Sequence, residues 1–281
     1  MTRASAPIKA ARIARRNPLL VVGVLIVLVW VIAALFASQI APFQPLTQNV
    51  SARLQAPGMD VHTWGTDELG RDIFSRVLYG GRITIPAGVL VIVIGSILGT
   101  VIGAVAGYVG GMWDEIIMRI TELFMAFPTI ILAMAITAAL GADIRNAIIA
   151  LVIVWWPSYA RLVRGIVLKV KRNEYVEAAH CIGASNFYIL TRTVLPNCIA
   201  PTIVLTTLDI GNAILTFAGL SFLGLGPEPT SPEWGRMVAV GIDYFDQWWT
   251  WLFPGLAMAT LVVASNFIGD SLHEIFDPRL R

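Results

Sequence analysis

Charged side chains are scarce in this sequence, and their scarcity excludes an ordinary soluble domain. Only 14% of the 281 residues are Asp, Glu, Lys or Arg, while 57% are hydrophobic and the mean hydropathy is +0.74. A soluble domain carries roughly 25% charged residues, so this chain is expected to cross a membrane several times. The formal net charge of +2 gives no basis for nucleic-acid binding, and we expect none.

The residues that enzymes use for phosphate or metal chemistry are also few. Lysine occurs only at Lys9, Lys169 and Lys171, and none of these follows a glycine, so the sequence has no Walker A phosphate-binding loop. The three histidines are isolated, and Cys181 and Cys198 do not have the spacing of a zinc site. We therefore predict no catalytic residue, no metal site and no enzymatic activity.

Six apolar stretches are long enough to cross a bilayer as helices. The first, 19–40, is an uncharged run of 22 residues after a basic arm, which exceeds the apolar length of a cleaved signal peptide. The others are roughly 83–108, 120–141, 146–163, 199–223 and 248–269. The sequence therefore predicts an all-α polytopic membrane protein with six transmembrane helices embedded in a lipid bilayer.

The basic residues predict which side of the membrane each loop faces. With both termini in the cytoplasm and Arg161 assigned to the cytoplasmic end of the fourth span, 14 of the 20 Lys and Arg residues lie on the inner side. Cytoplasmic loops carry an excess of basic residues, so we expect 109–119 and 164–198 to be inside. The expected division of the chain is a basic arm with the first span, an extracytoplasmic loop, a transmembrane core and a cytoplasmic tail, at 1–42, 43–82, 83–270 and 271–281.

The longest polar interruption in the second half, 174–198, is predicted to be a hairpin of two short helices. Gly183 is expected to end the first helix, Ser185 to cap the second, and Pro196 to end the second. Such a hairpin is a docking element or, alternatively, an amphipathic loop in the lipid headgroups. The apolar face predicted for its first helix is Tyr175, Ala178, Ala179 and Ile182.

This hairpin resembles the EAA loop of the membrane-spanning subunits of ABC importers. In that pattern an alanine pair follows a glutamate, a glycine comes four residues after the pair, and Leu-Pro closes the motif. Thr193 departs from the pattern, which usually has isoleucine there. The resemblance implies that the first helix is the coupling helix, which contacts a partner ATPase. The matching residues are Glu177, Ala178, Ala179, Gly183, Leu195 and Pro196.

Three further segments resemble the C-type subunit of the dipeptide and oligopeptide permeases. They are a charged outer loop at 62–82, the run 220–235 after the fifth span, and the C-terminal segment from 266. Phe217 departs from this subfamily, which commonly has a glutamate there. We expect the outer loop to be ordered, charge-paired and able to help dock an outer binding protein. Its matching residues are Gly65, Thr66, Asp67, Leu69, Gly70, Arg71, Asp72, Ser75 and Arg76.

The resemblance extends over essentially the whole chain and implies a type I importer permease of the bacterial inner membrane. Such a chain works with a second homologous permease, two ATP-binding subunits and an extracytoplasmic substrate-binding protein. ATP and Mg²⁺ would bind the ATPase subunits, and no cofactor would bind this chain. Peptides are the implied substrates, with nickel, glutathione and antimicrobial peptides as alternatives. A secondary transporter without an ATPase is the rival class, but the sequence shows no internal repeat typical of one.

A carboxylate inside the fifth predicted span suggests a functional position. Asp209 lies near the middle of that span, and Asn212 follows it by about one turn. A carboxylate in hydrocarbon is costly, so it usually faces a water-filled path or the interior of the helix bundle. The sequence leaves open whether Asp209 lines the translocation path or bonds to a neighbouring helix.

Small residues and charges on the second span and the loop after it predict two local contacts. Asp114 or Glu115 is a candidate partner for Arg119 on one helical face, as a local surface pair. A ladder of glycines at four-residue spacing predicts a close helix contact in the bundle. These glycines are Gly95, Gly99, Gly103 and Gly107.

Overall fold

The fold is helical throughout the part of the chain that the structure, a computed structural model, describes. That part comprises residues 17–59 and 61–276, so the basic arm and the end of the tail lie outside it. It contains two isolated β-bridges and no strand. Five helices are long and apolar enough to cross a membrane. They are α2 (Pro18–Leu35), α4 (Ile73–Val109), α7 (Ile144–Val170), α10 (Pro196–Phe222) and α12 (Trp249–Phe276).

The remaining predicted span, 120–141, is broken, so its prediction as one helix is wrong. The chain forms α5 (Gly111–Met125) and α6 (Thr129–Leu140), which are bent by 92° where they meet. Pro128 lies at the break, where it lacks an N–H for a helical bond and disfavours helical geometry at the residue before it. With this pair counted as one span, the all-α fold with six apolar spans is confirmed, while the cytoplasmic position of the termini stays a prediction.

Several predicted boundaries also shift. The first span is divided at Phe36 into α2 and the short α3 (Ala37–Ile40). Helix α4 begins at Ile73, so the second part of the expected outer loop is helical, and α5 makes the expected inner loop helical. The other short elements are η1 (Val50–Ala52), α8 (Glu174–Cys181), α9 (Asn186–Tyr188), η2 (Ile189–Val194) and α11 (Trp234–Ile242).

The most extensive helix contact joins α4 to α7, and the glycine ladder lies in it. A Cβ atom at Gly103 would collide with the carbonyl oxygen of Ala160, and one at Gly99 with that of Trp156. Because these glycines have no side chains, the two backbones approach closely. All four glycines would place a Cβ against α7, namely Gly95, Gly99, Gly103 and Gly107.

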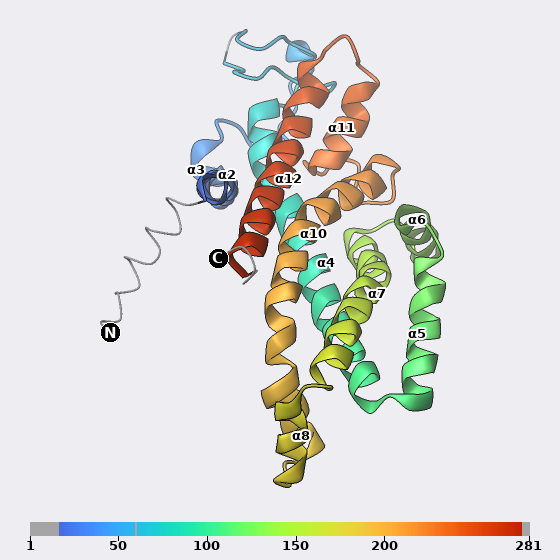
Figure 1. Cartoon of the computed structure of the whole chain (residues 1–281). Helices are drawn as coiled ribbons and strands as arrows, with labels where there is room; N and C mark the ends of the chain where they lie inside the picture. The colour runs from blue at the N-terminus through green and yellow to red at the C-terminus, as the bar shows by residue number, and fades with distance from the viewer. Residues whose placement is uncertain (1–16, 60, 277–281) are drawn as a thin grey trace, which may run out of the picture.

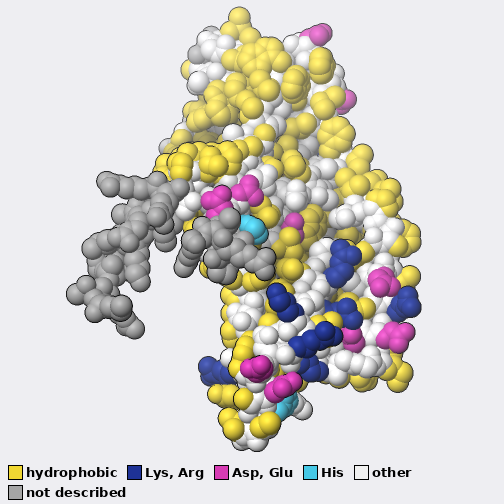
Figure 2. Space-filling view, in the orientation of Figure 1, with side chains coloured by type: hydrophobic (Ala, Val, Ile, Leu, Met, Phe, Trp, Pro, Cys, Tyr) yellow, Lys and Arg dark blue, Asp and Glu magenta, His cyan; other side chains and the backbone are white. Residues whose placement is uncertain are grey.

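The two ends of the molecule differ in character. Figure 1 shows the hairpin with α8 at one end, and α11 with the loop before α4 at the other. On the face in Figure 2, Lys and Arg side chains gather around α5, α7 and the hairpin, while the opposite end is mostly apolar. This distribution agrees with a hairpin on the cytoplasmic side.

An ion pair between helices fixes α5 to α7, and it replaces the local pair expected for Asp114. The carboxylate of Asp114 accepts bonds from Arg164 Nε at 2.6 Å and Nη2 at 2.7 Å. Arg119 instead reaches Glu122, at 3.4 Å. Two parallel bonds between guanidinium and carboxylate give a stronger, more directional pair than a single contact. The prediction that Asp114 or Glu115 pairs with Arg119 is therefore wrong.

Reversing one charge of this pair is expected to destabilise the protein, and reversing both to restore it in part. Asp114→Arg or Arg164→Asp places like charges together, which we expect to cost about 1–2 kcal/mol and to lower the melting temperature by roughly 2–8 °C. The double variant should recover at least half of that loss. Tryptophan fluorescence of the purified protein in detergent measures the melting. A double variant no more stable than the worse single variant would contradict the pairing.

Candidate functional site

The polar hairpin between α7 and α10 begins with α8, whose end has a defined hydrogen-bond pattern. The N–H of Gly183 donates to the carbonyl of His180 at 3.0 Å, and the N–H of Ala184 donates to that of Ala179 at 3.1 Å. Gly183 has φ of 83°, a left-handed conformation that glycine adopts without strain. These two bonds form a Schellman cap, which ends the helix at the glycine.

Three of the four residues in the predicted apolar face of α8, Tyr175, Ala178 and Ile182, are exposed. Val176 is the buried residue of this helix, whereas Glu177 and Ala178 are exposed and Ala179 is half-buried. An exposed group of large apolar side chains marks a contact surface for another molecule. We call this group, together with Ala178, the hairpin tip. Its large members and their exposed fractions are Tyr175 at 49%, Ile182 at 84%, Phe187 at 77% and Tyr188 at 57%.

The second half of the hairpin passes into α10 without a loop. Ser185 caps α9 by accepting a bond from the Tyr188 N–H at 3.3 Å, and η2 then forms a turn of π-helix. Pro196 is the first residue of α10, where a missing N–H costs nothing. The prediction that Pro196 ends the second helix is therefore wrong. Leu195 immediately before it is half-buried and belongs to the same helical rod.

A buried cluster anchors the hairpin to the bundle. Tyr108, at the end of α4, makes two hydrogen bonds from this cluster. Its backbone carbonyl accepts from Lys171 Nζ at 2.7 Å, and its hydroxyl donates to Asn186 Oδ1 at 3.2 Å. Displacing α8 would thus move α4, α7 and α10 together. Sequence reasoning missed these three residues. Tyr108 ends a predicted span and Asn186 follows the predicted cap, whereas Lys171 lies between the fourth predicted span and the hairpin. The cluster contains Ala104, Tyr108, Val163, Val167, Val170, Val176, Ile189, Val194 and Cys198.

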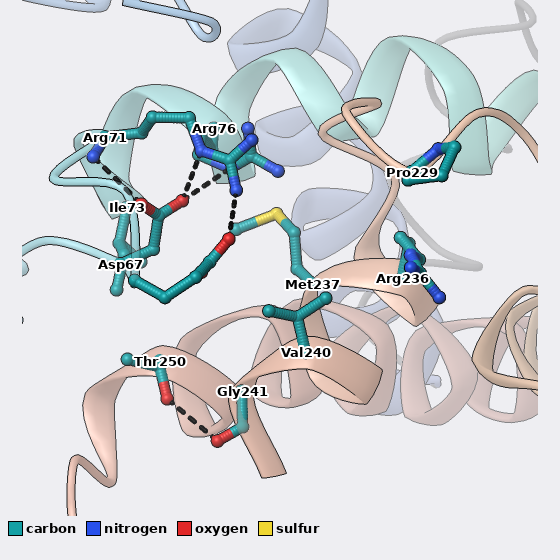
Figure 3. A pocket seen from close by; sticks show the side chains of 11 residues that line it. Asp67, Arg71, Ile73, Arg76, Pro229, Arg236, Met237, Val240, Gly241 and Thr250 are labelled. Atoms are coloured by element: carbon teal, nitrogen blue, oxygen red, sulfur yellow. Dashed lines mark hydrogen bonds and ion pairs between the residues drawn. The ribbon is translucent and has the colours of Figure 1, made fainter. Parts of the chain in front are cut away.

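At the opposite end of the molecule, the charged outer loop is folded onto α4. Asp67 accepts from Arg71 Nε at 2.7 Å and pairs with Arg76 at 3.4 Å (Figure 3). Arg71 also reaches Glu68 at 2.7 Å. Burial, assisted by the charge of Asp67, raises the pKa of Glu68. Asp72 caps α4 by accepting from the Ser75 N–H at 2.7 Å. The loop is therefore ordered and charge-paired, as predicted.

A buried carboxylate joins α11 to this outer end. Glu233 caps α11 by accepting from the N–H groups of Gly235 at 2.9 Å and Arg236 at 2.8 Å, and it also accepts from Thr84 Oγ1 at 3.1 Å. Burial raises the pKa of Glu233. Trp234 adds a bond from its Nε1 to the carbonyl of Val77 at 2.8 Å. Helix α11 is thus fixed to α4, and the outer end is a rigid surface.

A polar hollow of about 500 Å³ lies between α6, α7 and α10, and Asp209 and Asn212 both line it. Asp209 Oδ2 accepts from the Tyr159 hydroxyl at 3.0 Å and from Trp155 Nε1 at 3.3 Å. Asn212 is exposed. Asp209 therefore bonds to a neighbouring helix, as one of the two alternatives predicted, and it also borders the hollow; that it lines the translocation path stays a prediction.

Known proteins match the chain over nearly its whole length. Residues 99–281 match the family described as "Binding-protein-dependent transport system inner membrane component". The chain belongs to this family. Residues 9–57 also match the "N-terminal TM domain of oligopeptide transport permease C". The charged outer loop lies between the two matched segments.

Two relatives illustrate the range of this family. The dipeptide transport system permease protein DppC of Alkalihalophilus pseudofirmus is 40% identical over 95% of this chain and 88% of its own length. The glutathione transport system permease protein GsiD of Escherichia coli is 42% identical over 95% of this chain and 88% of its own length. This chain is accordingly a multi-pass transport subunit of the inner membrane rather than an enzyme. The hairpin and the hollow both lie in the segment that defines the family.

Proposed function

We propose that this chain is the C-type permease of an ATP-driven peptide importer and forms half of its translocation path. The observation that carries the proposal is the hairpin tip, an exposed apolar surface on a helix anchored in the bundle. Relatives named for dipeptide and glutathione transport support a peptide as substrate. Nickel and antimicrobial peptides are the other candidates within the same importer class.

The partners follow from this assignment. A second homologous permease would complete the path, and two ATPase subunits, which bind ATP and Mg²⁺, would lie below the hairpins. Ala178 leaves room for close approach of an ATPase groove, Ala179 fits against the hairpin's own core, and Glu177 offers a charge to a basic residue of the ATPase. An extracytoplasmic binding protein would dock on the rigid end formed by the outer loop and α11.

The anchoring of the hairpin gives a route from ATP to the path. When the ATPase subunits close, they displace α8, and the buried cluster passes this motion to α4 and α7. Helix α10 moves as well, because η2 joins it directly to the hairpin. Asp209 and Asn212 lie on α10, so the same motion changes the shape of the hollow. Access to the path then alternates between the two sides of the membrane.

Reconstitution of the complete importer tests this function. The chain, its partner permease, both ATPases and the binding protein are placed in liposomes, and uptake of a radiolabelled dipeptide is measured. Uptake is expected only with ATP inside and with every subunit present. Uptake that persists without the ATPases would indicate a secondary transporter instead. Uptake of nickel with no uptake of any peptide would overturn the peptide assignment.

A further inference from the structure

A second hollow lies beside the next turn of α7 toward its C-terminal end. It has a volume of about 270 Å³ and lies between α5 and α7. We call the hollow at Asp209 the outer hollow and this one the inner hollow. Ser158 lines the outer hollow and Arg161 and Arg164 line the inner one. Residues three apart are neighbours on the surface of a helix, so the two hollows adjoin along α7, and we call them together the charged track.

The two hollows carry opposite charges. The outer hollow contains the carboxylate of Asp209, held by Trp155 and Tyr159. In the inner hollow, Arg164 is engaged by Asp114, whereas the side chain of Arg161 is exposed and has no bond to any other described residue. Arg161 is therefore available to a ligand. Glu122 at the rim is exposed and pairs with Arg119.

This charged track cannot face hydrocarbon. A charged side chain near the centre of a membrane, where Asp209 lies, costs roughly 2.5–3.5 kcal/mol or more, so such a residue faces water or a protein partner. The lipid-facing side of α2 shows the contrast, since its exposed large residues are leucine, valine and isoleucine. The face with the two hollows is therefore the one that meets the path between the two permease subunits.

We propose that this track binds the two ends of a zwitterionic peptide in passage, its ammonium at Asp209 and its carboxylate at Arg161. The inference rests on the proposed function. Ser158 lines the outer hollow together with Asp209, and Arg161 lies three residues, about 4.5 Å, further along the axis of α7. An extended dipeptide spans about 7 Å, which is of the same order as this axial offset. The order of charges gives the peptide a direction, with its carboxyl end toward the cytoplasm.

Cysteine labelling of the complete importer tests the order of charges. In a Cys181→Ser background, Ser158→Cys reports the outer hollow and Ala126→Cys the inner one. A charged cleft raises the local concentration of ions of opposite charge 10-fold or more. At position 158 a cationic methanethiosulfonate should therefore react about tenfold faster than an anionic one. At position 126 the cationic reagent should react about tenfold more slowly than the anionic one. Ala142→Cys, in an exposed loop, should show no such preference.

Neutral variants then assign each preference to its residue. Asp209→Asn should reduce the preference for the cationic reagent at position 158 to below about threefold and leave the preference at position 126 unchanged. Arg161→Gln should reduce the preference for the anionic reagent at position 126 to below about threefold and leave position 158 unchanged. The inference would be overturned if neither variant changed the ratio of cationic to anionic labelling rates, or if the cysteines at 158 and 126 did not react at all.

Transport separates this inference from the proposed function. Each neutral variant should slow dipeptide uptake about tenfold, with Asp209→Glu restoring most of the rate. If the unmodified importer takes up dipeptides and the neutral variants do so equally well, the charged track is wrong and the proposed function stands. If the unmodified importer takes up no peptide, the proposed function itself fails, whatever the labelling shows.

Discussion

Replacing Ala178 with arginine is expected to abolish ATP-driven uptake while leaving the chain folded. Ala178 lies exposed on the hairpin tip, so a larger side chain there meets nothing within this chain. In a packed contact with an ATPase, the extra bulk should cost about 1–3 kcal/mol, which weakens the complex roughly 5- to 150-fold. The measurement is dipeptide uptake by the reconstituted importer, with recovery of the ATPase on purification of the tagged permease.

A matched control uses an exposed alanine elsewhere. Ala142 lies in the short connection between α6 and α7, far along the chain from the hairpin. Ala142→Arg should leave uptake and ATPase recovery unchanged. Normal uptake by the Ala178→Arg protein at normal expression would refute the coupling role of the hairpin.

The second large effect is expected at the helix contact that carries the glycine ladder. Gly103→Ala should destabilise the protein by about 1–3 kcal/mol, because the added methyl group collides with the carbonyl oxygen of Ala160 and forces α4 away from α7. Yield from membranes and the melting temperature in detergent should both fall. The thermal unfolding of the purified protein, followed by tryptophan fluorescence, measures the loss.

Gly165 provides the matched control for this substitution. It lies on α7, is exposed, and has no atom within 4 Å of the place where a Cβ would be. Gly165→Ala should therefore be neutral or stabilise the protein by roughly 0.5–1 kcal/mol, since alanine favours helix over glycine. Equal behaviour of the two variants would show that the α4–α7 contact is looser than described.

Local sequence signals predicted the end of α8 at Gly183 and the cap at Ser185, and they failed where distant residues decide. Gly183 ends α8 because glycine adopts a left-handed backbone conformation without strain, and this property depends on the residue type alone. The partner of Asp114 is Arg164, fifty residues away, and Tyr108 meets Lys171 and Asn186 only after folding. A pattern within one segment favours local pairs and cannot identify such partners.

The effect of a proline inside a predicted span also depends on residues far away in the sequence. Pro86, Pro157, Pro201 and Pro254 all lie within continuous helices, whereas Pro128 separates two helices bent by 92°. In a bundle, neighbouring helices and polar side chains satisfy the backbone groups that a proline leaves free. The outcome depends on the packing around each proline, which the sequence does not display.

Site-specific photocross-linking from the hairpin tip tests the central claim most directly. A photoreactive amino acid is placed at Ala178 or, as the control, at Ala142, and native membranes are irradiated before mass spectrometry of the products. Position 178 is expected to capture a subunit with a Walker A loop, and position 142 is expected to capture none. Cross-links from position 178 to lipid alone would show that the hairpin lies in the headgroups and would exclude its role in docking an ATPase.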